Sequence, residues 1–372
     1  GWELLHNGTT ERSGKIEDLS VEPQGTAEYD IPYGQTSEDG EWLLNLSYTL
    51  KTDEPLIPAG HEIARQQLSL NEFKHTYGGV SASKGRITLL GGKTTRVTGD
   101  DFAIEFGANG LIDKYEIAGQ SLLAEGAVIE PKFWRAPTDN DYGARLQQRF
   151  ATWRNPRLKL KSLDTTGNGA TATFDMADQK ATLILTYTLT ADGQVIVRQQ
   201  MQTDKEAKVS ELFRYGMRLQ MPATFSQVEY YGRGPIENYA DRNTSQFLGL
   251  WKNKVSDEYY EYVRPQESGN HTDVRWFSVL DGQGHGLQFY SNAPMETSAL
   301  PYTREQLDDG PVKDKARGHH SGDLVPDALT EVHVQQRQLG MGCVNSWGAW
   351  PLEQYRLPYR DYDFTFAIKP IK

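Results

Sequence analysis

The stretch ATLILTYTLTADGQVIVRQQ, residues 181–200, has the pattern of two half-buried strands joined by a tight turn. Apolar and polar side chains alternate in its first half, which is the period of a strand with one buried face. The residues that share the apolar face are Leu183, Leu185, Tyr187 and Leu189. Asp192-Gly193 is a turn dipeptide, and a second apolar run follows it. The stretch therefore predicts an antiparallel β-hairpin.

The same alternation recurs along most of the chain. The residues that it places together on one strand face are Leu44, Leu46, Tyr48 and Leu50, then Phe102, Ile104 and Phe106, and near the end Tyr362, Phe364, Phe366 and Ile368. Asn109-Gly110 follows the second of these sets, and an Asn-Gly dipeptide is the strongest kind of short hairpin signal. The repeated pattern predicts an all-β fold.

Helical periodicity is scarce. We expect one short helix within residues 144–153 and another that starts at Thr303, where Gln306 stands at capping-box spacing. Residues 308–330 are polar, charged and rich in Gly and Pro, which predicts a surface loop.

The 372-residue chain is long enough for two domains, one of them large. We expect a small domain at residues 1–74, a linker at residues 75–86, where glycines and small polar residues interrupt the alternation, and a large domain at residues 87–372. The small domain has room for five or six strands, enough for an immunoglobulin-like sandwich, and the large one fits an extended antiparallel sandwich. Because the chain opens directly in a strand-like segment, we interpret it as a piece of a longer protein and expect an unpaired edge in the small sandwich.

Charge and cysteine content disfavour several classes of function. The chain has 39 basic and 50 acidic residues and a net charge of -11, whereas proteins that track phosphates need a basic face. We therefore expect neither nucleic acid nor a membrane as partner, and no apolar run approaches the ~18 residues of a membrane span. Cys343 is the only cysteine, which argues against an intramolecular disulfide and a cysteine-based zinc site.

Two pairs of carboxylates are candidates for sugar chemistry, because glycoside hydrolysis normally uses two carboxyl groups across the scissile bond. Asp139 and Asp141 lie in a dense run of Asx residues, a composition more typical of turns and backbone caps. Glu237 and Asp241 lie beside arginines, so a salt-bridged turn accounts for them without catalysis. The abundant aromatic residues, 8 Trp, 19 Tyr and 13 Phe, likewise suit either a sandwich core or platforms for sugar rings.

Four segments of the large domain together resemble a known family. They are residues 133–141 (FWRAPTDND), residues 232–239 (GRGPIENY), residues 265–270 with 273–276 (PQESGN and DVRW), and residues 345–348 (NSWG). Their sequences and order resemble the C-terminal region of large bacterial β-galactosidases, which are family 2 glycoside hydrolases. The small domain, which ends near residues 59–64 (AGHEIA), is similar to the linker sandwich of the same family.

This resemblance implies a protein of five domains, of which the chain would cover most of the fourth and all of the fifth. The fifth is a supersandwich related to galactose mutarotases. The catalytic acid and nucleophile, both glutamates, belong to a barrel domain, as do the magnesium and sodium sites of the family. We therefore expect no catalytic residue, no metal ligand and no cofactor in this chain. Its implied partners are a β-galactoside and the barrel, the oligomeric state of the parent protein is left open, and the compartment is either the bacterial cytoplasm or the periplasm.

By resemblance, Trp347 matches a tryptophan that stacks on sugar in the outer, aglycone-binding part of the active site. An indole offers a rigid apolar face to the C–H face of a pyranose. Polar Asn345 and Ser346 precede it and are candidate further contacts, although a core position for Trp347 is the alternative. We expect an exposed ring on a loop at one edge of the large domain. Residues 343–345 depart from the glycine and acid common in the family, which leaves the preferred aglycone open.

The other matched residues are predicted to be structural. They are Trp134, Arg135, Asp139, Asn140, Asp141, Glu237, Asn238, Arg275 and Trp276. We expect each arginine to stack on the adjacent tryptophan as a cation–π pair. We also expect the Asx run to pin its loop between the sheets.

Three functions compete at this point. The first is a non-catalytic portion of a β-galactosidase-type retaining hydrolase that forms a carbohydrate-contacting wall of the active-site mouth. The second is a stand-alone mutarotase-like enzyme, for which His271 or His285 with Glu237 or Glu267 would be the acid and base. The third is a pure carbohydrate-binding or assembly module.

Overall fold

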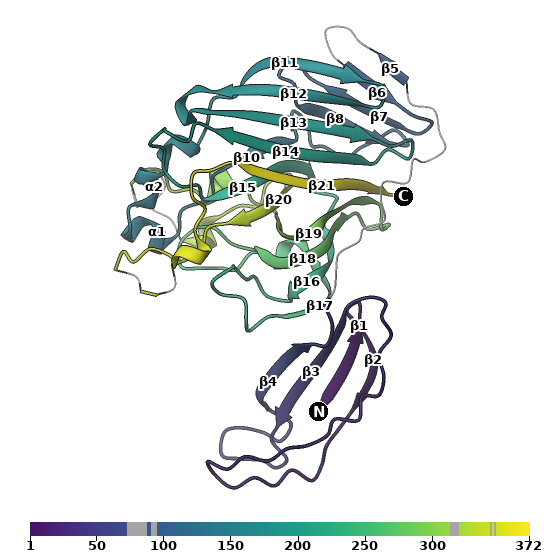
Figure 1. Ribbon diagram of the computed structural model, residues 1–372, viewed down its shortest axis with the longest axis vertical. Coiled ribbons are helices and arrows are strands. Elements are labelled where there is room, and N and C mark those ends of the chain that lie inside the picture. The colour runs from purple at the N-terminus through teal and green to yellow at the C-terminus, as the bar shows by residue number, and fades with distance from the viewer. Residues whose placement is uncertain (73–87, 91–94, 313–319, 343, 346) are drawn as a thin grey trace. The chain divides into compact units, whose positions relative to one another are not determined.

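The computed structural model describes residues 1–72, 88–90, 95–312, 320–342, 344–345 and 347–372. The chain divides into two compact units, the first of residues 1–75 with Phe247–Leu250 and the second of residues 76–246 with 251–372. Strands dominate both units and the helices are short, so the predicted all-β fold is confirmed (Figure 1). The predicted linker at residues 75–86 lies outside the described residues, and the domain boundaries stay a prediction.

The first unit is built on one antiparallel sheet, which has four strands in the described residues. In sheet order these are β2 (Thr9–Gly14), β1 (Trp2–His6), β3 (Trp42–Thr49) and β4 (Glu62–Ser69). Its buried core side chains are Trp2, Leu4, Trp42 and Leu44, with Ile16, Ile31 and Tyr33 of the β2–β3 loop packed against them. The expected face of β3 ends before Tyr48, which is 53% exposed. Loop side chains therefore cover one side of this sheet.

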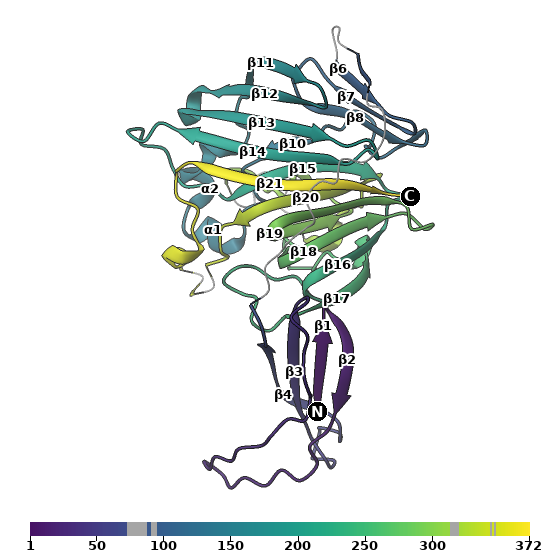
Figure 2. The ribbon, with the colours of Figure 1, turned by 45° about the vertical axis from the view of Figure 1, so that its right-hand side comes forward.

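The second unit contains two sheets (Figures 1 and 2). The smaller sheet consists, in order, of β5 (Thr88–Leu90), β6 (Thr95–Thr98), β7 (Phe102–Phe106), β8 (Ile112–Ile117) and β9 (Gln120–Ser121). The large sheet runs in order through β10 (Glu130–Lys132), β15 (Arg214–Pro222), β20 (Leu329–Gln338), β19 (Gly286–Leu300), β21 (Tyr362–Ile371), β14 (Val195–Thr203), β13 (Ala181–Leu189), β12 (Gly169–Met176) and β11 (Lys159–Thr166). The long strand β19 also pairs with β18 (His271–Leu280), and the sheet continues from there through β16 (Gln227–Gly234) to β17 (Phe247–Lys254).

The two predicted hairpins are confirmed. Strands β13 and β14 pair antiparallel, with Leu189 opposite Val195 across the predicted turn. Strands β7 and β8 pair in the same way around Asn109-Gly110. Gly110 and Gly193 have φ values of +76° and +86°, a left-handed conformation that glycine adopts without steric cost. The local turn chemistry therefore decided these pairings.

The core of the second unit extends over most of its strands, and one part of it lies between the smaller sheet and strands β11–β14 of the large one. Phe106 of β7 meets Tyr187 of β13 edge to face, with the ring centroids 5.0 Å apart. The hydroxyl of Tyr115 on β8 donates to the carbonyl oxygen of Gly193 at 2.6 Å. The predicted apolar faces of β7, β13 and β21 are all buried, so the alternation identified the core side of each strand.

The helix expected within residues 144–153 starts earlier and is broken. Thr138 and Asp141 form a capping box, which starts α1 (Asp139–Gly143). Arg145 has a φ of +59°, and this left-handed conformation interrupts the helical hydrogen bonding. The chain continues as α2 (Leu146–Arg149) and a 3₁₀ turn at Ala151–Trp153.

The second predicted helix is confirmed as α3 (Arg304–Leu307), with the capping box between Thr303 and Gln306. The surface loop predicted directly after it is wrong at its start, because Asp308 and Asp309 are buried. Arginine partners explain this: Arg154 donates to Asp308 at 2.6 Å, and the buried Arg304 donates to it at 3.2 Å. Further 3₁₀ turns lie at Ala177–Gln179, Val255–Asp257, Ser321–Asp323 and Glu353–Tyr355. In the part of the chain that the structure describes, no helix is long and apolar enough to cross a membrane.

Candidate functional site

Three of the segments that carried the resemblance meet in the second unit, although they are far apart in the sequence, and residues 339–342, just before the segment at residues 345–348, join them. We call residues 133–141, 232–242, 265–272 and 339–342 the motif cluster. Hydrogen bonds link each of these four segments to at least one of the others. The exposed loop that contains Trp347 follows the last segment directly.

A buried ion pair lies at the centre of the motif cluster. The guanidinium of Arg135, fully buried, donates to Asp141 through Nε at 3.1 Å and Nη2 at 2.8 Å. Burial by itself would lower the pKa of Arg135, but the carboxylate of Asp141 raises that pKa overall, so the guanidinium stays charged. It also donates to the carbonyl oxygens of Leu339 and Gly340, the latter at 3.1 Å. The pair therefore fixes the backbone of the fourth segment.

Two further side chains hold the next residues of that segment from opposite directions. Asn140 Nδ2 donates to the carbonyl oxygens of Met341 and Gly342 at 3.0 and 3.3 Å. The carboxylate of Asp241 accepts from the amides of the same two residues at 2.8 and 3.0 Å. A Cβ on Gly340 would lie 2.5 Å from Asp241 Oδ2, so this approach needs glycine. The chain that enters the Trp347 loop is thus bound through both its carbonyl and its amide groups.

The second and third segments are joined around Glu237 and Asn238. Glu237 accepts from Arg242 Nη2 at 2.6 Å and from the amide of Gly269 at 2.7 Å. The amide of Asn238 donates to the Asn270 carbonyl at 2.6 Å, and Asn270 Nδ2 donates to the Asn238 carbonyl at 2.9 Å. Glu237 is therefore salt-bridged to Arg242 and links the second segment to the third.

The third segment also reaches back to the first. Glu267 accepts from the amide of Ala136 at 3.2 Å and forms a buried ion pair with Arg214. Gln266 Nε2 donates to Asp139 Oδ2 at 3.3 Å, while the amide of Asp139 donates to Gln266 Oε1 at the same distance. The carboxylates considered for sugar hydrolysis are thus engaged in holding segments together.

The structure gives both candidate acid–base histidines other carboxylate partners. His271 and Glu258 are buried against each other, with Nε2 2.5 Å from Oε2. His285 is half exposed, and its Nδ1 lies 3.9 Å from Asp281. The glutamates proposed beside them, Glu237 and Glu267, are each held by an arginine.

The expected cation–π partner of Arg135 is wrong. Its guanidinium lies 5.0 Å from the ring centroid of Phe213 and not over the adjacent Trp134. Neighbouring residues of an extended chain point to opposite sides, which separates the two side chains. Arg275 lies 5.6 Å from the ring centroid of Tyr231.

Trp347 is 91% exposed and lies on a loop. Its amide donates to Asn345 Oδ1 at 2.9 Å, so Asn345 shapes the turn that presents the ring. Gly348 has a φ of +101°, and a Cβ there would lie 2.8 Å from the carbonyl oxygen of Gly143 in α1. The loop is therefore seated against α1 on one side of Trp347. Ser346 lies outside the described residues, and the role of Trp347 in sugar binding stays a prediction.

Sequence analysis missed a polar face of the large sheet. Glu331, His333 and Gln335 lie two residues apart on β20 and are all buried. Burial lowers the pKa of His333 to about 3, although Glu331 lies 3.0 Å away, so the imidazole is neutral near pH 7. Polar residues at period two inside an apolar strand were the signal that could have revealed this face.

Glu296 of β19 belongs to the same face, because it pairs with Gln335 across the sheet. Asn270 Nδ2 donates to its carboxyl group at 3.3 Å. Burial raises the pKa of Glu296 from 4.5 to about 8. Its carboxyl group is therefore mostly protonated at neutral pH.

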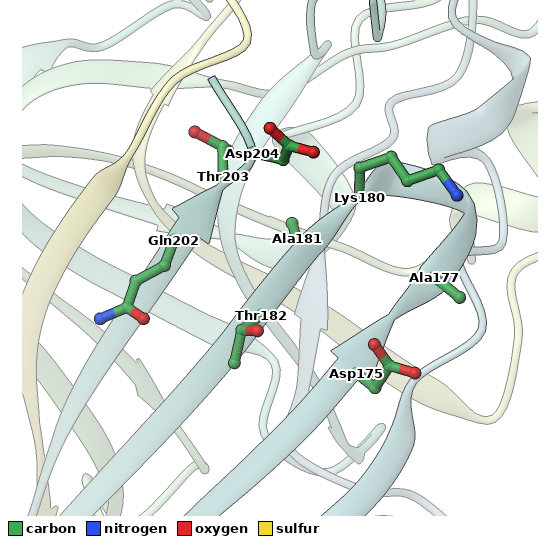
Figure 3. Close-up of a pocket in the computed structure, with 8 residues that line it drawn as sticks. All are labelled: Asp175, Ala177, Lys180, Ala181, Thr182, Gln202, Thr203 and Asp204. Atoms are coloured by element: carbon green, nitrogen blue, oxygen red, sulfur yellow. The ribbon is translucent and has the colours of Figure 1, made fainter. Parts of the chain in front are cut away.

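An open hollow of about 530 Å³ lies at one end of β12, β13 and β14 (Figure 3). Its lining residues are Asp175, Ala177, Lys180, Ala181, Thr182, Gln202, Thr203 and Asp204. In Figure 3 the side chains of Lys180 and Gln202 extend in opposite directions. The polar groups do not converge as they do in small-molecule sites. Across the described ranges, no group of three or more His, Cys, Asp or Glu side chains is placed to hold a metal ion.

Two protein-family models match the chain. Residues 98–368 match the beta galactosidase small chain, and residues 1–71 match domain 4 of beta-galactosidase.

Curated relatives match over almost the whole chain. The β-galactosidase of Priestia megaterium is 34% identical over 380 residues, a match that covers 98% of this chain and 36% of the relative. The β-galactosidase of Halalkalibacterium halodurans is 31% identical, with coverage of 99% and 36%. The chain thus spans about a third of the length of these relatives.

Solved structures give weaker matches. A galactose mutarotase related enzyme from Lactobacillus acidophilus has a TM-score of 0.44 and 8% identity, with 77% of this chain and 98% of that chain covered. A putative aldose 1-epimerase from Escherichia coli K12 has a TM-score of 0.39 and 10% identity, with 77% and 99% covered.

We predict that Asp241→Ala speeds hydrogen exchange at the amides of Met341 and Gly342, which lose their acceptor. A buried donor left unpaired costs roughly 1–3 kcal/mol, so the free energy of unfolding should fall by about that amount. Asp178→Ala is the control, because Asp178 is an exposed aspartate that lies outside the motif cluster. Exchange would be measured by mass spectrometry on peptides that cover these amides. Unchanged protection in Asp241→Ala would show that Asp241 does not hold the backbone of residues 341–342.

We also predict that Glu296→Gln flattens the pH dependence of stability. Because the folded-state pKa is raised from 4.5 to about 8, the stability that protonated Glu296 contributes is complete below pH 4.5 and is lost as the pH rises through 8. Glutamine cannot ionise, so the variant should be more stable than the parent chain at higher pH, with a difference that shrinks as the pH falls. Urea unfolding across this range tests the prediction, and parallel profiles for the two proteins would contradict it.

Proposed function

As the chain belongs to the β-galactosidase family, we propose that it is the non-catalytic, C-terminal part of a β-galactosidase and forms one wall of the active-site mouth. The substrate would be a terminal β-galactoside, hydrolysed with retention by a barrel domain in a part of the relatives that this chain does not match. The proposed partners of the chain are therefore that barrel and the sugar between them.

The observation that carries this proposal is the exposed indole of Trp347, 91% accessible on a loop that is anchored at both ends. Large aromatic rings bury much apolar surface in cores and interfaces, so one left in water on an anchored loop suits a binding role. The anchors are the contacts of residues 339–342 with Arg135, Asn140 and Asp241, and the contact of Gly348 with α1. A platform fixed before binding loses little conformational entropy when a sugar arrives.

In this mechanism the chain binds and orients the substrate, while the barrel domain carries out the hydrolysis. The face of Trp347 would stack on the aglycone sugar and hold the glycosidic oxygen toward the barrel. Retaining hydrolysis uses two carboxyl groups about 5 Å apart across the bond. Asp141, Glu237 and Glu267 are engaged by arginines, which supports a positioning role for them and not a catalytic one.

The mutarotase-like alternative receives no support from the geometry around its histidines. His271 and Glu258 are each only 1% exposed, so a free sugar does not reach them. Acid–base catalysis needs a group within hydrogen-bonding reach of the substrate proton. We therefore favour the wall over an independent epimerase, and we propose that any magnesium or sodium belongs to the barrel.

We predict that the 372-residue chain alone does not hydrolyse nitrophenyl β-galactoside, because its carboxylates serve structure. The measurement is nitrophenol release at high protein concentration, before and after repurification. Turnover that survives repurification and disappears in Asp139→Asn would refute the prediction.

In the complete enzyme, Trp347→Ala should raise KM for substrates with a sugar aglycone and impair transfer to sugar acceptors. Loss of one aromatic stacking contact, about 0.5–1.5 kcal/mol, corresponds to roughly a two- to twelvefold effect. The KM of Trp347→Phe should lie between that of the unmodified enzyme and that of Trp347→Ala. Val344→Ala is the matched control, because Val344 is a 61% exposed apolar residue of the same loop. Equal KM values and transfer rates for Trp347→Ala and Val344→Ala would show that the Trp347 ring does not bind the aglycone sugar.

A further inference from the structure

A separate pocket opens on the second unit, with a volume of about 240 Å³. Its lining residues include Ile236, Glu237, Arg242, Gln246, Tyr260 and Tyr262, and Trp347 is not among them. The pocket combines an apolar side with a polar side, as small-molecule sites do.

Two tyrosines and an isoleucine form the apolar side. The rings of Tyr260 and Tyr262 have their centroids 4.7 Å apart and are inclined by 50°. The amide of Tyr262 donates to the carbonyl oxygen of Tyr260 at 2.9 Å, and this tight turn holds the rings beside each other. Tyr260 is 52% exposed and Ile236 is 55% exposed, so this apolar surface faces solvent.

The polar side is organised by a buried carboxylate. The Glu237 side chain is 3% exposed and accepts from Arg242 Nη2 at 2.6 Å. The same Nη2 donates to the hydroxyl oxygen of Tyr262 at 2.8 Å. Gln246 Oε1 accepts from the amide of Ile236 at 3.2 Å, and its Nε2 donates to Ser245 Oγ at 3.2 Å, so both ends of this side-chain amide are held in place. A guanidinium and an amide are therefore fixed in place before any ligand binds.

We propose that this pocket is a second carbohydrate-binding site, which takes one neutral pyranose ring and acts without the catalytic barrel. The tyrosine pair would receive the C–H face of the ring. The N–H groups of Arg242 other than those of Nη2, and the second N–H group of Gln246 Nε2, would donate to adjacent sugar hydroxyl groups.

Charge and size set the class of ligand. Glu237 neutralises Arg242 within the pocket, and the chain carries a net charge of -11, so the pocket favours a neutral ligand over an anion. The volume lies a little below the ~300–1,000 Å³ of ordinary small-molecule sites, which fits one ring better than several.

The pocket and the Trp347 loop can be tested independently. The neighbouring side chains Asp241 and Arg242 diverge in function, because Asp241 binds the amides of residues 341–342 and Arg242 binds Glu237. The Tyr260 side chain is 52% exposed. The backbone amide of Tyr260 donates to Ser268 Oγ at 2.8 Å, and a side-chain substitution leaves this bond in place. Tyr260→Ala therefore removes pocket surface without dismantling the fold.

The experiment titrates the 372-residue chain with methyl β-galactoside and with lactose, followed by saturation-transfer NMR and calorimetry. We expect saturable binding with Kd in the millimolar range, weakened at least tenfold by Tyr260→Ala and restored in part by Tyr260→Phe. Val344→Ala, at an exposed apolar residue of the loop that carries Trp347, should leave this binding unchanged. Tyr48→Ala is the matched control, because Tyr48 is a tyrosine of nearly equal exposure, 53%, on the first unit.

Three outcomes would overturn the proposal. One is the absence of saturable binding to either sugar. Another is equal binding by Tyr260→Ala and Tyr48→Ala, which would make the pocket a packing hollow. The last is binding that Trp347→Ala abolishes and Tyr260→Ala spares. The proposed function of the Trp347 loop is tested separately, because its readouts are the KM and the rate of transfer to sugar acceptors in the complete enzyme.

Discussion

The ion pair between Arg135 and Asp141 is the constraint on which the candidate site depends. Two charges removed from water are stable only when their remaining hydrogen-bonding groups are also satisfied. Arg135 meets this requirement with the carbonyl groups of Leu339 and Gly340, and Asp141 with the amide of Thr138 at 2.8 Å. The need to satisfy a buried charge therefore draws two distant segments together. The position of the loop that carries Trp347 follows from that need.

The β-architecture explains why such a site can form on loops. Long antiparallel strands with apolar faces create a rigid core, and the segments that connect them are free to carry polar side chains. The large sheet also carries a buried polar face of its own, where Glu296, His333 and Gln335 lie on β19 and β20. Because burial disfavours the charged form, Glu296 and His333 are largely neutral at physiological pH. This face thus fits inside the unit without unpaired charges on either residue.

Both proposed sugar contacts follow the same physical scheme. Trp347 and Tyr260 are aromatic residues left in solvent, and each lies near a segment whose backbone amides donate to a carboxylate, that of Asp241 or of Glu237. An aromatic ring on a firmly held loop can stack on a sugar with little entropic loss. The two differ in their surroundings: Tyr260 has an arginine and an amide in its own pocket, whereas Trp347 offers a single face. The pocket with Tyr260 can therefore bind a sugar alone, whereas Trp347 needs the opposite wall of a cleft.

The sequence by itself determined the strands and hairpins, because alternation such as that of residues 181–189 and turns such as Asn109-Gly110 depend on neighbouring residues only. It also pointed to the motif segments, through their resemblance to a family. It failed where distant contacts decide. Arg145 breaks the expected helix in a left-handed conformation, Asp308 pairs with Arg154 from a distant segment, and Arg135 packs on Phe213. Only the tertiary structure decided which carboxylate meets which arginine and which aromatic ring stays in water, since those outcomes depend on burial and partners that no local pattern encodes.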